Sequence, residues 1–451
     1  MVQISTTYFN EIEDRIDAPF YQEQYLKPIR KFQTKGIAIG NLGDYVKSVS
    51  NGIEIRKYVY HGTPYLRVSD MKSIFVSLSA VKFVKETIDD VSKKIRLTTN
   101  DILISRSGTP GITAIVSREI LNTIISSHIM RVVTQSEKLN PFFLAVYLNS
   151  LPGRLQIDRI TNGCLVSEIS HGALEIIKVP LLDIKQQERI ANLVATAESK
   201  HAEAINKINE AKGVFEDVVN INHDEIREEK TYKINSADLT DILTPKFYYP
   251  KYLNTLKALK KKFKTIKLGD IADIKRGDEV GSKNYRKYPD KNDSDVPFIR
   301  TSDLVNYEID NYPDYYIDEG TYNDLERNLR AGDIIYTKDG KIGLPAILTN
   351  EDKCILASGL VRIRITKTLD PYYVFLVLAT NVGYYQALQR IVIAATLSHL
   401  QQDRLAEIEL PLLDNQTQKK ISQLVKEAFE LKTEKKKLFR EALTMVEELL
   451  K

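Results

Sequence analysis

Two kinds of hydrophobic pattern alternate along the chain. Short β-branched segments, in which apolar and polar positions alternate between Gly, Asp and Pro residues, predict strands at 102–105, 129–133, 334–337 and 361–365. After each of two Pro-Leu-Leu-Asp sequences, at 180–183 and 411–414, apolar residues recur every three or four positions, which predicts a long helix. We therefore expect mixed α/β regions that alternate with long helices.

Both predicted helices carry a heptad seam. The seam residues are Ile190, Val194, Ala197, His201, Ala204, Ile208, Ala211, Phe215 and Val218 in the first helix and Ile421, Leu424, Ala428, Leu431, Lys435, Leu438, Ala442, Met445 and Leu449 in the second. The alanines permit close approach, so we expect the two helices to pair over roughly 50 Å. The polar His201 and Lys435 either fix the register of this pair or, for Lys435, extend to solvent at a frayed position.

The chain also contains an internal repeat. Leu42-Gly43-Asp44 returns as Leu268-Gly269-Asp270, and residues 20–21, 66–70 and 100–108 return in the same order as 247–248, 299–303 and 332–340. All offsets lie between 226 and 233 residues. Such small drift indicates two copies of one structural unit of roughly 225 residues.

The repeat predicts the domain organisation. We expect globular domains at 1–184 and 236–415, helices at 185–222 and 416–451, and a linker at 223–235, because the polar stretch around 220–230 has no apolar period. The predicted fold class is α+β, a tandem duplication of a mixed α/β domain plus a long helix.

Composition excludes several classes of protein. Hydrophobic residues make up 43% and charged residues 27% of the 451 positions, which is typical of a globular chain with a buried core. Cys164 and Cys354 stand alone, which excludes a disulfide framework and a cysteine zinc site and fits a reducing cytoplasm. The first 14 residues lack a basic apolar leader and no apolar run approaches a membrane span, so we expect a protein that is neither secreted nor embedded. A net charge of +4 confines any DNA-binding surface to patches.

Enzymatic motifs are missing from the sequence. It contains no GxxxxGK[ST] loop, no GxGxxG after a strand, no HExxH helix and no Pro-Pro dipeptide, and its six histidines have no metal-ligand spacing. We therefore predict no catalytic residue, no metal and no cofactor. One alternative remains, because Pro313-Asp314 with Asp339-Gly340-Lys341 resembles a metal-dependent PD-(D/E)xK nuclease, although the first copy has Ser107-Gly108-Thr109 instead.

Each copy places polar side chains in a glycine-bounded loop after a strand. Arg106, Ser107 and Thr109 in the first copy correspond to a loop with Lys338 and Lys341 in the second. Glycines let the backbone approach a ligand, and cations and hydroxyls suit phosphate oxygens or guanine edges. The same pattern also fits a hairpin whose glycines serve only the turn.

Further candidates for DNA contact lie at strand ends and in basic clusters. Residues 67–70 and 300–303 either read a groove or cap a strand, and the clusters at 257–267 and 276–291 either bind phosphates or form a solvated face. The predicted DNA-binding residues are Arg67, Ser69, Arg106, Ser107, Thr109, Arg276, Lys283, Arg300, Ser302, Lys338 and Lys341.

The order of these sequences, present twice and separated by long helices, resembles the specificity (S) subunit of type I restriction-modification systems. The resemblance covers about residues 8–451 and includes Leu-Gly-Asp, Arg-x-x-Asp, the 100–108 loop sequence and the helix start at 180–191. It implies two target-recognition domains, each reading half of a bipartite asymmetric DNA site. Residues 15–21 resemble the segment that precedes each recognition domain, whereas residues 241–248 depart from it.

The resemblance also implies an assembly. The helices would form an antiparallel coiled coil through Ile190, Val194, Ile208, Phe215, Ile421, Leu424, Leu431 and Leu438. This coiled coil would dock two DNA methyltransferase subunits and, through them, restriction subunits. The chain itself would choose where chemistry happens, without catalysing it and without a cofactor of its own. A coiled-coil scaffold with no DNA role is the remaining alternative.

Overall fold

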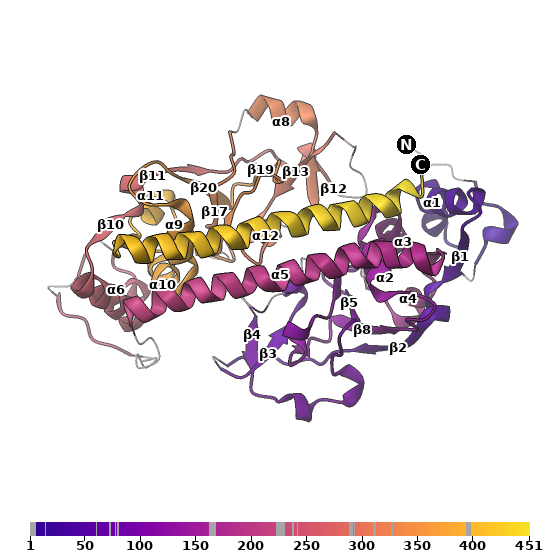
Figure 1. Cartoon of the computed structure of the whole chain (residues 1–451), viewed down its shortest axis with the longest axis horizontal. Helices are drawn as coiled ribbons and strands as arrows, with labels where there is room; N and C mark the ends of the chain where they lie inside the picture. The colour runs from indigo at the N-terminus through magenta and orange to yellow at the C-terminus, as the bar shows by residue number, and fades with distance from the viewer. Residues whose placement is uncertain are drawn as a thin grey trace. The chain divides into compact units, whose positions relative to one another are not determined.

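The computed structural model divides the chain into two compact units (Figure 1). Unit 1 contains Met1–His201 and Glu434–Lys451, and unit 2 contains Ala202–Thr433. The structure describes residues 6–13, 15–59, 61–71, 74–76, 78, 81–161, 168–221, 231–236, 239–240, 242–287, 292, 294–309, 313–325, 328–393 and 398–451. Most of the linker predicted at 223–235, together with Cys164 and residues 288–291 of the second basic cluster, lies outside these residues.

The described residues of unit 1 form three sheets. An antiparallel sheet has the order β2-β8-β5-β6, a second has the order β4-β3-β7, and β1 pairs with β9. The strands are β1 (Ala38–Asn41), β2 (Val46–Asn51), β3 (Thr63–Leu66), β4 (Lys82–Val84), β5 (Ile102–Ser105), β6 (Thr113–Ile115), β7 (Ile124–Ile125), β8 (Ile129–Thr134) and β9 (Lys178–Leu181). The helices are α1 (Glu23–Thr34), α2 (Pro141–Asn149), α3 (Leu151–Thr161), α4 (His171–Glu175) and parts of α5 (Ile184–Val219) and α12 (Asn415–Glu448).

Unit 2 repeats this topology. Its sheet β11-β20-β17-β18 corresponds to β2-β8-β5-β6, β16-β13-β19 corresponds to β4-β3-β7, and β10-β23 corresponds to β1-β9. The strands are β10 (Thr265–Lys267), β11 (Ala272–Arg276), β12 (Tyr285–Lys287), β13 (Val296–Ile299), β14 (Leu304–Val305), β15 (Glu308–Ile309), β16 (Tyr315–Ile317), β17 (Ile334–Thr337), β18 (Pro345–Ile347), β19 (Ile355–Leu356), β20 (Leu360–Ile365), β21 (Val392–Ile393), β22 (Ser398–His399) and β23 (Glu409–Pro411). The strands predicted at 102–105 and 334–337 are β5 and β17, so both predictions are confirmed.

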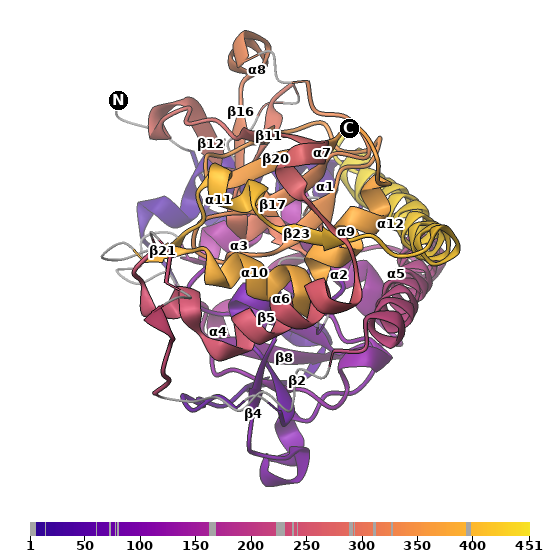
Figure 2. The same ribbon diagram turned by 90° about the vertical axis from the view of Figure 1, so that its left-hand side faces the viewer.

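Helices cover one face of the main sheet in unit 2. These are α6 (Pro250–Lys262), α7 (Leu268–Ile271), α9 (Pro371–Ala379), α10 (Asn381–Gln389) and α11 (Gln402–Ala406), with parts of α5 and α12, and Figure 2 shows α6 beside α10. The short helix α8 (Glu319–Leu325) packs instead on the second sheet, through Tyr322 and Leu325. Ile334, Val361 and Ile363 pack with α9 on that face, while Ile335 packs with Ile299 on the opposite face. The strand β17 is therefore buried on both sides, which explains why apolar side chains lie on both of its faces instead of alternating with polar ones.

A glycine ends the first strand of each main sheet. Gly52 follows β2 and Gly277 follows β11, and a Cβ at either position would overlap with backbone carbonyl oxygens of the strand alongside, at 125–126 or 356–357. Only glycine permits this close approach of two backbones. The same steric requirement in both units supports the predicted duplication.

The two long helices pair within each unit. In unit 2, Lys207 on α5 forms an ion pair with Glu427 on α12 (2.5 Å), and Ala204 and Ile208 pack on Ala428. In unit 1, the ion pair joins residue 200 on α5 to residue 434 on α12. Because lower numbers on α5 pair with higher numbers on α12, the helices run antiparallel.

The buried face of α12 is wider than a heptad seam. Ile190, Val194, Ile208, Phe215 and Ile421 are almost fully buried and Leu424 is 8% exposed, whereas Leu431 and Leu438 are only half-buried. Lys432, Lys435, Lys436 and Phe439 are buried instead. The interpretation that Lys435 extends into solvent at a frayed position is therefore wrong, because this lysine is buried.

A hairpin of unit 2 explains why Lys432 is buried. The turn between β14 and β15 has positive φ angles at Asn306 (53°) and Tyr307 (64°). Lys432 Nζ donates to the carbonyl of Asn306 (2.7 Å) and lies 3.7 Å from the buried Glu308 carboxylate. The Lys212 ammonium donates to the Tyr307 hydroxyl (2.7 Å), so both long helices hold this hairpin.

In unit 1, His201 on α5 occupies the position that is equivalent to Lys432 on α12. Its ring stacks on Phe75, with ring centres 5.6 Å apart, and the histidine is 2% exposed. Phe75 follows the strand end at 67–70 as the hairpin follows the strand end at 300–303. His201 thus contacts the globular part of its own unit.

None of the helices in the described part of the chain combines the length and the apolar character needed to cross a membrane.

We predict that Lys432→Met lowers the free energy of unfolding by about 3–5 kcal/mol, because it removes the buried ammonium that donates to the Asn306 carbonyl and lies 3.7 Å from the Glu308 carboxylate. Guanidinium denaturation of the full chain, followed by circular dichroism, measures this loss. Lys426→Met on the exposed side of the same helix is the control and should unfold like the native chain. Equal midpoints for the two variants would show that the Lys432 contacts contribute nothing.

Candidate DNA-binding interface

The first loop, residues 106–111, is fixed by backbone hydrogen bonds on both sides of Arg106. Its N–H donates to the carbonyl of His128 (2.9 Å), and its own carbonyl accepts from the N–H of Ile169 (2.8 Å). The position of Arg106 is therefore set by two segments that are distant in sequence.

The second loop, residues 338–343, is fixed in the same way. The N–H of Lys338 donates to the carbonyl of Gly359 (3.0 Å), and the Lys338 carbonyl accepts from the N–H of Leu400 (2.8 Å). Positions 106 and 338 are therefore equivalent, and so are 128 and 359, and 169 and 400.

A hydroxyl and a glycine shape both loops. Ser105 and Thr337 each accept, through the side-chain oxygen, the backbone N–H seven residues later at 2.8 Å. Gly108 and Gly340 have φ angles of 81° and 66°, and no atom lies within 4 Å of where a Cβ would be. These glycines are thus required by the turn, as the hairpin interpretation held, and they leave the exposed loop tips open to a ligand.

The polar side chains of the first loop have partners from other segments. The Arg106 guanidinium forms an ion pair with Glu168. Ser107 Oγ lies 2.5 Å from His128 Nδ1, and His128 Nε2 lies 3.8 Å from the Glu54 carboxylate. Thr109 is exposed at the tip.

The second loop holds different groups at the same positions. Lys338 Nζ lies 2.7 Å from one oxygen of Asp339, and His399 Nδ1 lies 2.9 Å from the other. Asp339 stands where the first loop has Ser107, and Lys341 is half-buried beyond it. The two loops therefore share a backbone and differ in chemistry.

An acidic residue follows the close-approach glycine of each unit, Gly52 or Gly277, by two positions. Glu54 accepts from the Ser127 hydroxyl (2.8 Å) and pairs with Arg56 (3.1 Å). The Ser127 hydrogen bond, assisted by Arg56, lowers the pKa of Glu54. In unit 2, Glu279 pairs with Arg276 (3.3 Å).

The strand end at Arg67 is both a cap and an ion pair. Asp70 accepts the backbone N–H of Arg67 (3.1 Å) and the guanidinium Nε (3.1 Å). The Arg67 guanidinium lies 6.0 Å from the ring centre of Tyr58. Ser69 is exposed beside Asp70.

The corresponding strand end in unit 2 has a second aspartate. Asp303 accepts the backbone N–H of Arg300 (2.8 Å), while the Arg300 guanidinium pairs with Asp314 (3.0 Å) and lies 4.1 Å from the ring centre of Tyr315. Ser302 lies next to Asp303. The capping interpretation thus describes the aspartates, and both arginine side chains remain about one-third exposed.

A short turn in each unit brings these segments together. In unit 2, the turn at 357–359 bonds to Lys338 and accepts the Arg276 Nε (3.4 Å), and a Cβ on Gly359 would lie 2.8 Å from the Thr301 hydroxyl. In unit 1, the turn at 126–128 bonds to Arg106 and to the strand that ends before Arg67. We refer to these two sets of loops as the candidate DNA-binding interface.

Other predicted basic residues lie outside this interface. Lys283 is exposed in a short 3-10 helix (Ser282–Asn284) that lies apart in sequence from the loops of this interface. In the cluster at 257–267, Lys260 pairs with Glu409 (2.8 Å), Lys267 pairs with Glu407 (2.7 Å), and Lys262 donates to backbone carbonyls. These contacts favour a structural role for that cluster.

The nuclease alternative gains no support. Asp314 is paired with Arg300, and Asp339 is paired with Lys338 and His399. Within the described ranges, no group of three or more His, Cys, Asp or Glu side chains is arranged to hold a metal ion.

Sequence reasoning missed the partners of the loop residues. These are Glu54, His128, Glu168, Glu279 and His399. They lie in segments without matching strings, because different residues occupy the equivalent positions, such as Glu168 and His399, or His128 and Gly359. The available signal was the pair of serines at 127 and 358, which follow the equivalent short strands β7 and β19.

Two solved structures illustrate what the chain is similar to. The S subunit of a type I restriction-modification system from M. genitalium is 15% identical, with 92% of this chain and 95% of that chain covered and a TM-score of 0.35. The HsdS subunit from Thermoanaerobacter tengcongensis is 14% identical, with 92% and 96% covered and a TM-score of 0.29. No curated protein matches the chain.

The sequence itself matches a family model in two places. The model is that of the type I restriction modification DNA specificity domain, and it matches residues 36–211 and 260–440. These two matches cover most of the chain and repeat the duplication seen in both sequence and fold. The chain therefore belongs to the type I restriction-modification DNA specificity family, as a recognition subunit without a catalytic role of its own.

Proposed function

We propose that this specificity chain reads a split, asymmetric DNA site, one half through the interface of each unit. The observation that carries the proposal is the pair of loops at 106–111 and 338–343, which share a backbone and differ in side chains. Two loops with the same backbone path present their side chains to a DNA groove in the same way. Loops that differ in side chains therefore select different base sequences.

The differences involve groups that distinguish bases. Ser107 offers a hydroxyl that donates or accepts, whereas Asp339 at the same position offers only acceptors. Carboxylates accept from cytosine N4, and hydroxyls pair with several bases. Arg67 and Arg300, held beside tyrosine rings, are suited to guanine edges or phosphates.

We also propose that two copies of one partner, a DNA methyltransferase subunit, dock on the chain and bring restriction subunits with them. Matched apolar side chains support this. Ile12 and Ile16 in unit 1 are 48% and 88% exposed, and Leu239 and Leu243 in unit 2 are 49% and 76% exposed. Each pair is separated by four residues and precedes a Phe-Tyr sequence.

The segments that carry these side chains are built alike. The Tyr21 hydroxyl accepts from the N–H of Glu13, and the Tyr248 hydroxyl accepts from the N–H of Thr240, both at 2.8 Å. Two copies of one surface suit two copies of one partner. The cofactor of methyl transfer belongs to that partner, and the assembly works where the DNA is, in the cytoplasm.

The first prediction concerns the DNA site. Cells that express the chain with its neighbouring methyltransferase should gain a methylated motif of two short blocks around a fixed gap, detected by single-molecule sequencing of modified bases. Cells with the methyltransferase alone provide the control. The proposal fails if the methyltransferase is active and bound and no such motif appears.

The second prediction concerns Asp339. Asp339→Asn should strengthen binding to DNA that lacks the target site and make that binding more salt-dependent, because it removes a negative charge and releases Lys338 toward phosphates. Fluorescence anisotropy across a salt series measures this slope. Asp324→Asn, an exposed residue on α8, is the control. A slope unchanged from that control would remove Lys338 and Asp339 from the interface.

The third prediction concerns the partner. Ile16→Asp and Leu243→Asp should each reduce the bound methyltransferase from two copies to one, and the double variant should bind it at least tenfold more weakly. Analytical ultracentrifugation gives the stoichiometry. Val392→Asp, at another exposed apolar residue of 45% exposure, is the control. Two copies on the double variant would contradict the docking proposal.

A further inference from the structure

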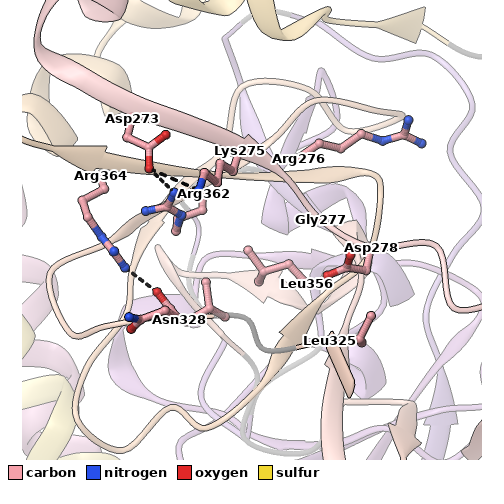
Figure 3. Close-up of a pocket in the computed structure, with 11 residues that line it drawn as sticks. Asp273, Lys275, Arg276, Gly277, Asp278, Leu325, Asn328, Leu356, Arg362 and Arg364 are labelled. Atoms are coloured by element: carbon pink, nitrogen blue, oxygen red, sulfur yellow. Dashed lines mark hydrogen bonds and ion pairs between the residues drawn. The ribbon is translucent and has the colours of Figure 1, made fainter. Parts of the chain in front are cut away.

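Unit 2 contains a charged cavity beside β11 and β20. The cavity has a volume of about 450 Å³, and Asp273, Lys275, Arg362 and Arg364 line it (Figure 3). The strand register sets Asp273 opposite Arg364 and Lys275 opposite Arg362. These four side chains therefore leave the sheet on the same face.

Arg362 is buried in this cavity with part of its guanidinium unused. The residue is 6% exposed, and its Nη2 pairs with Asp273 at 2.5 Å. This pairing lowers the pKa of the Asp273 carboxyl. Arg362 Nη1 is also buried, and it has no hydrogen-bond acceptor among the residues that the structure describes. A buried N–H without an acceptor is costly, which points to a ligand.

The equivalent arginine in unit 1 has no such spare group. Arg131 on β8 lies opposite Ser50 on β2, as Arg362 lies opposite Lys275. Its Nε pairs with Asp101 (2.5 Å), its Nη1 donates to the carbonyl of Lys94 (2.8 Å), and its Nη2 donates to the Thr98 hydroxyl (3.1 Å). All three guanidinium nitrogens of Arg131 thus donate hydrogen bonds within unit 1.

A second arginine has taken over this structural role in unit 2. Arg364 stands where unit 1 has Val133, and it binds Asp333, the equivalent of Asp101, through two hydrogen bonds of 2.7 and 2.6 Å. Arg362 is therefore not needed for that aspartate. Lys275 Nζ lies 3.9 Å from the same Asp273 carboxylate, and its side chain, which is 63% exposed, adds a further cation at the cavity.

We propose that this cavity binds a phosphate group, with Arg362 and Lys275 as its donors. Guanidinium and ammonium groups are the usual protein ligands of phosphate oxygens. The cavity also borders the interface, since Arg276 lines it and bonds to the turn at 357–359, and Figure 3 shows the Arg276 side chain directed away from Asp273. A DNA backbone phosphate is one source, which rests on the proposed DNA recognition, and free phosphate is the other.

The test uses the full chain and two ligands. Inorganic phosphate is titrated by calorimetry at constant ionic strength, and DNA binding is measured across a salt series. Lys275→Ala and Arg362→Gln should each weaken phosphate binding at least tenfold. Lys367→Ala, an exposed lysine of the same unit, is the matched control and should bind phosphate as the native chain does. Lys275 is exposed, so its variant keeps the test valid if Arg362→Gln does not fold.

The DNA series distinguishes the two sources. A salt slope reduced by about one in Lys275→Ala identifies a backbone phosphate, and an unchanged slope with lost phosphate binding identifies free phosphate. The proposal is overturned if Lys275→Ala matches Lys367→Ala with both ligands. Weakened phosphate binding in a chain that directs no split methylation motif would leave the phosphate site standing and reject the DNA-recognition proposal.

Discussion

The backbone hydrogen bonds on both sides of Arg106 and Lys338 are the constraint on which the interface depends. Each of these residues is held by a turn that follows a strand of the second sheet and by a segment just before the last short helix of its unit. Because backbone groups make these bonds, the side chains at positions 106 and 107, or 338 and 339, can differ while the loop keeps its path. The equivalent positions, Arg106 and Lys338 or Ser107 and Asp339, can therefore carry different side chains without loss of the fold.

Much of this architecture was predictable from the sequence. The strands β5 and β17 are apolar on both faces, and the regular spacing of apolar residues indicates the two long helices. The duplication followed from short strings such as Leu-Gly-Asp, which recur because the same turn is built twice. These features depend on local pattern, which a sequence displays directly.

The interface was harder to predict, for physical reasons. Asp339 was interpretable as a metal ligand until the structure showed His399 and Lys338 on its two oxygens. The burial of Lys432 was not predicted, because the heptad pattern describes only the packing of one helix against another. The helix α12 also packs against the hairpin at Asn306. Contacts between distant segments leave no spacing in the chain, so they appear only once the fold is known.

The Lys432 contact bears on how such a chain changes during evolution. The hairpin at Asn306 belongs to the globular part of unit 2, but the lysine that holds it belongs to the helix that follows. A recombination event with its crossover between residue 415 and Lys432 would combine a new globular domain with a lysine that fits the hairpin of the old domain. Modular exchange is therefore favoured when the helix is exchanged together with the domain at least as far as Lys432.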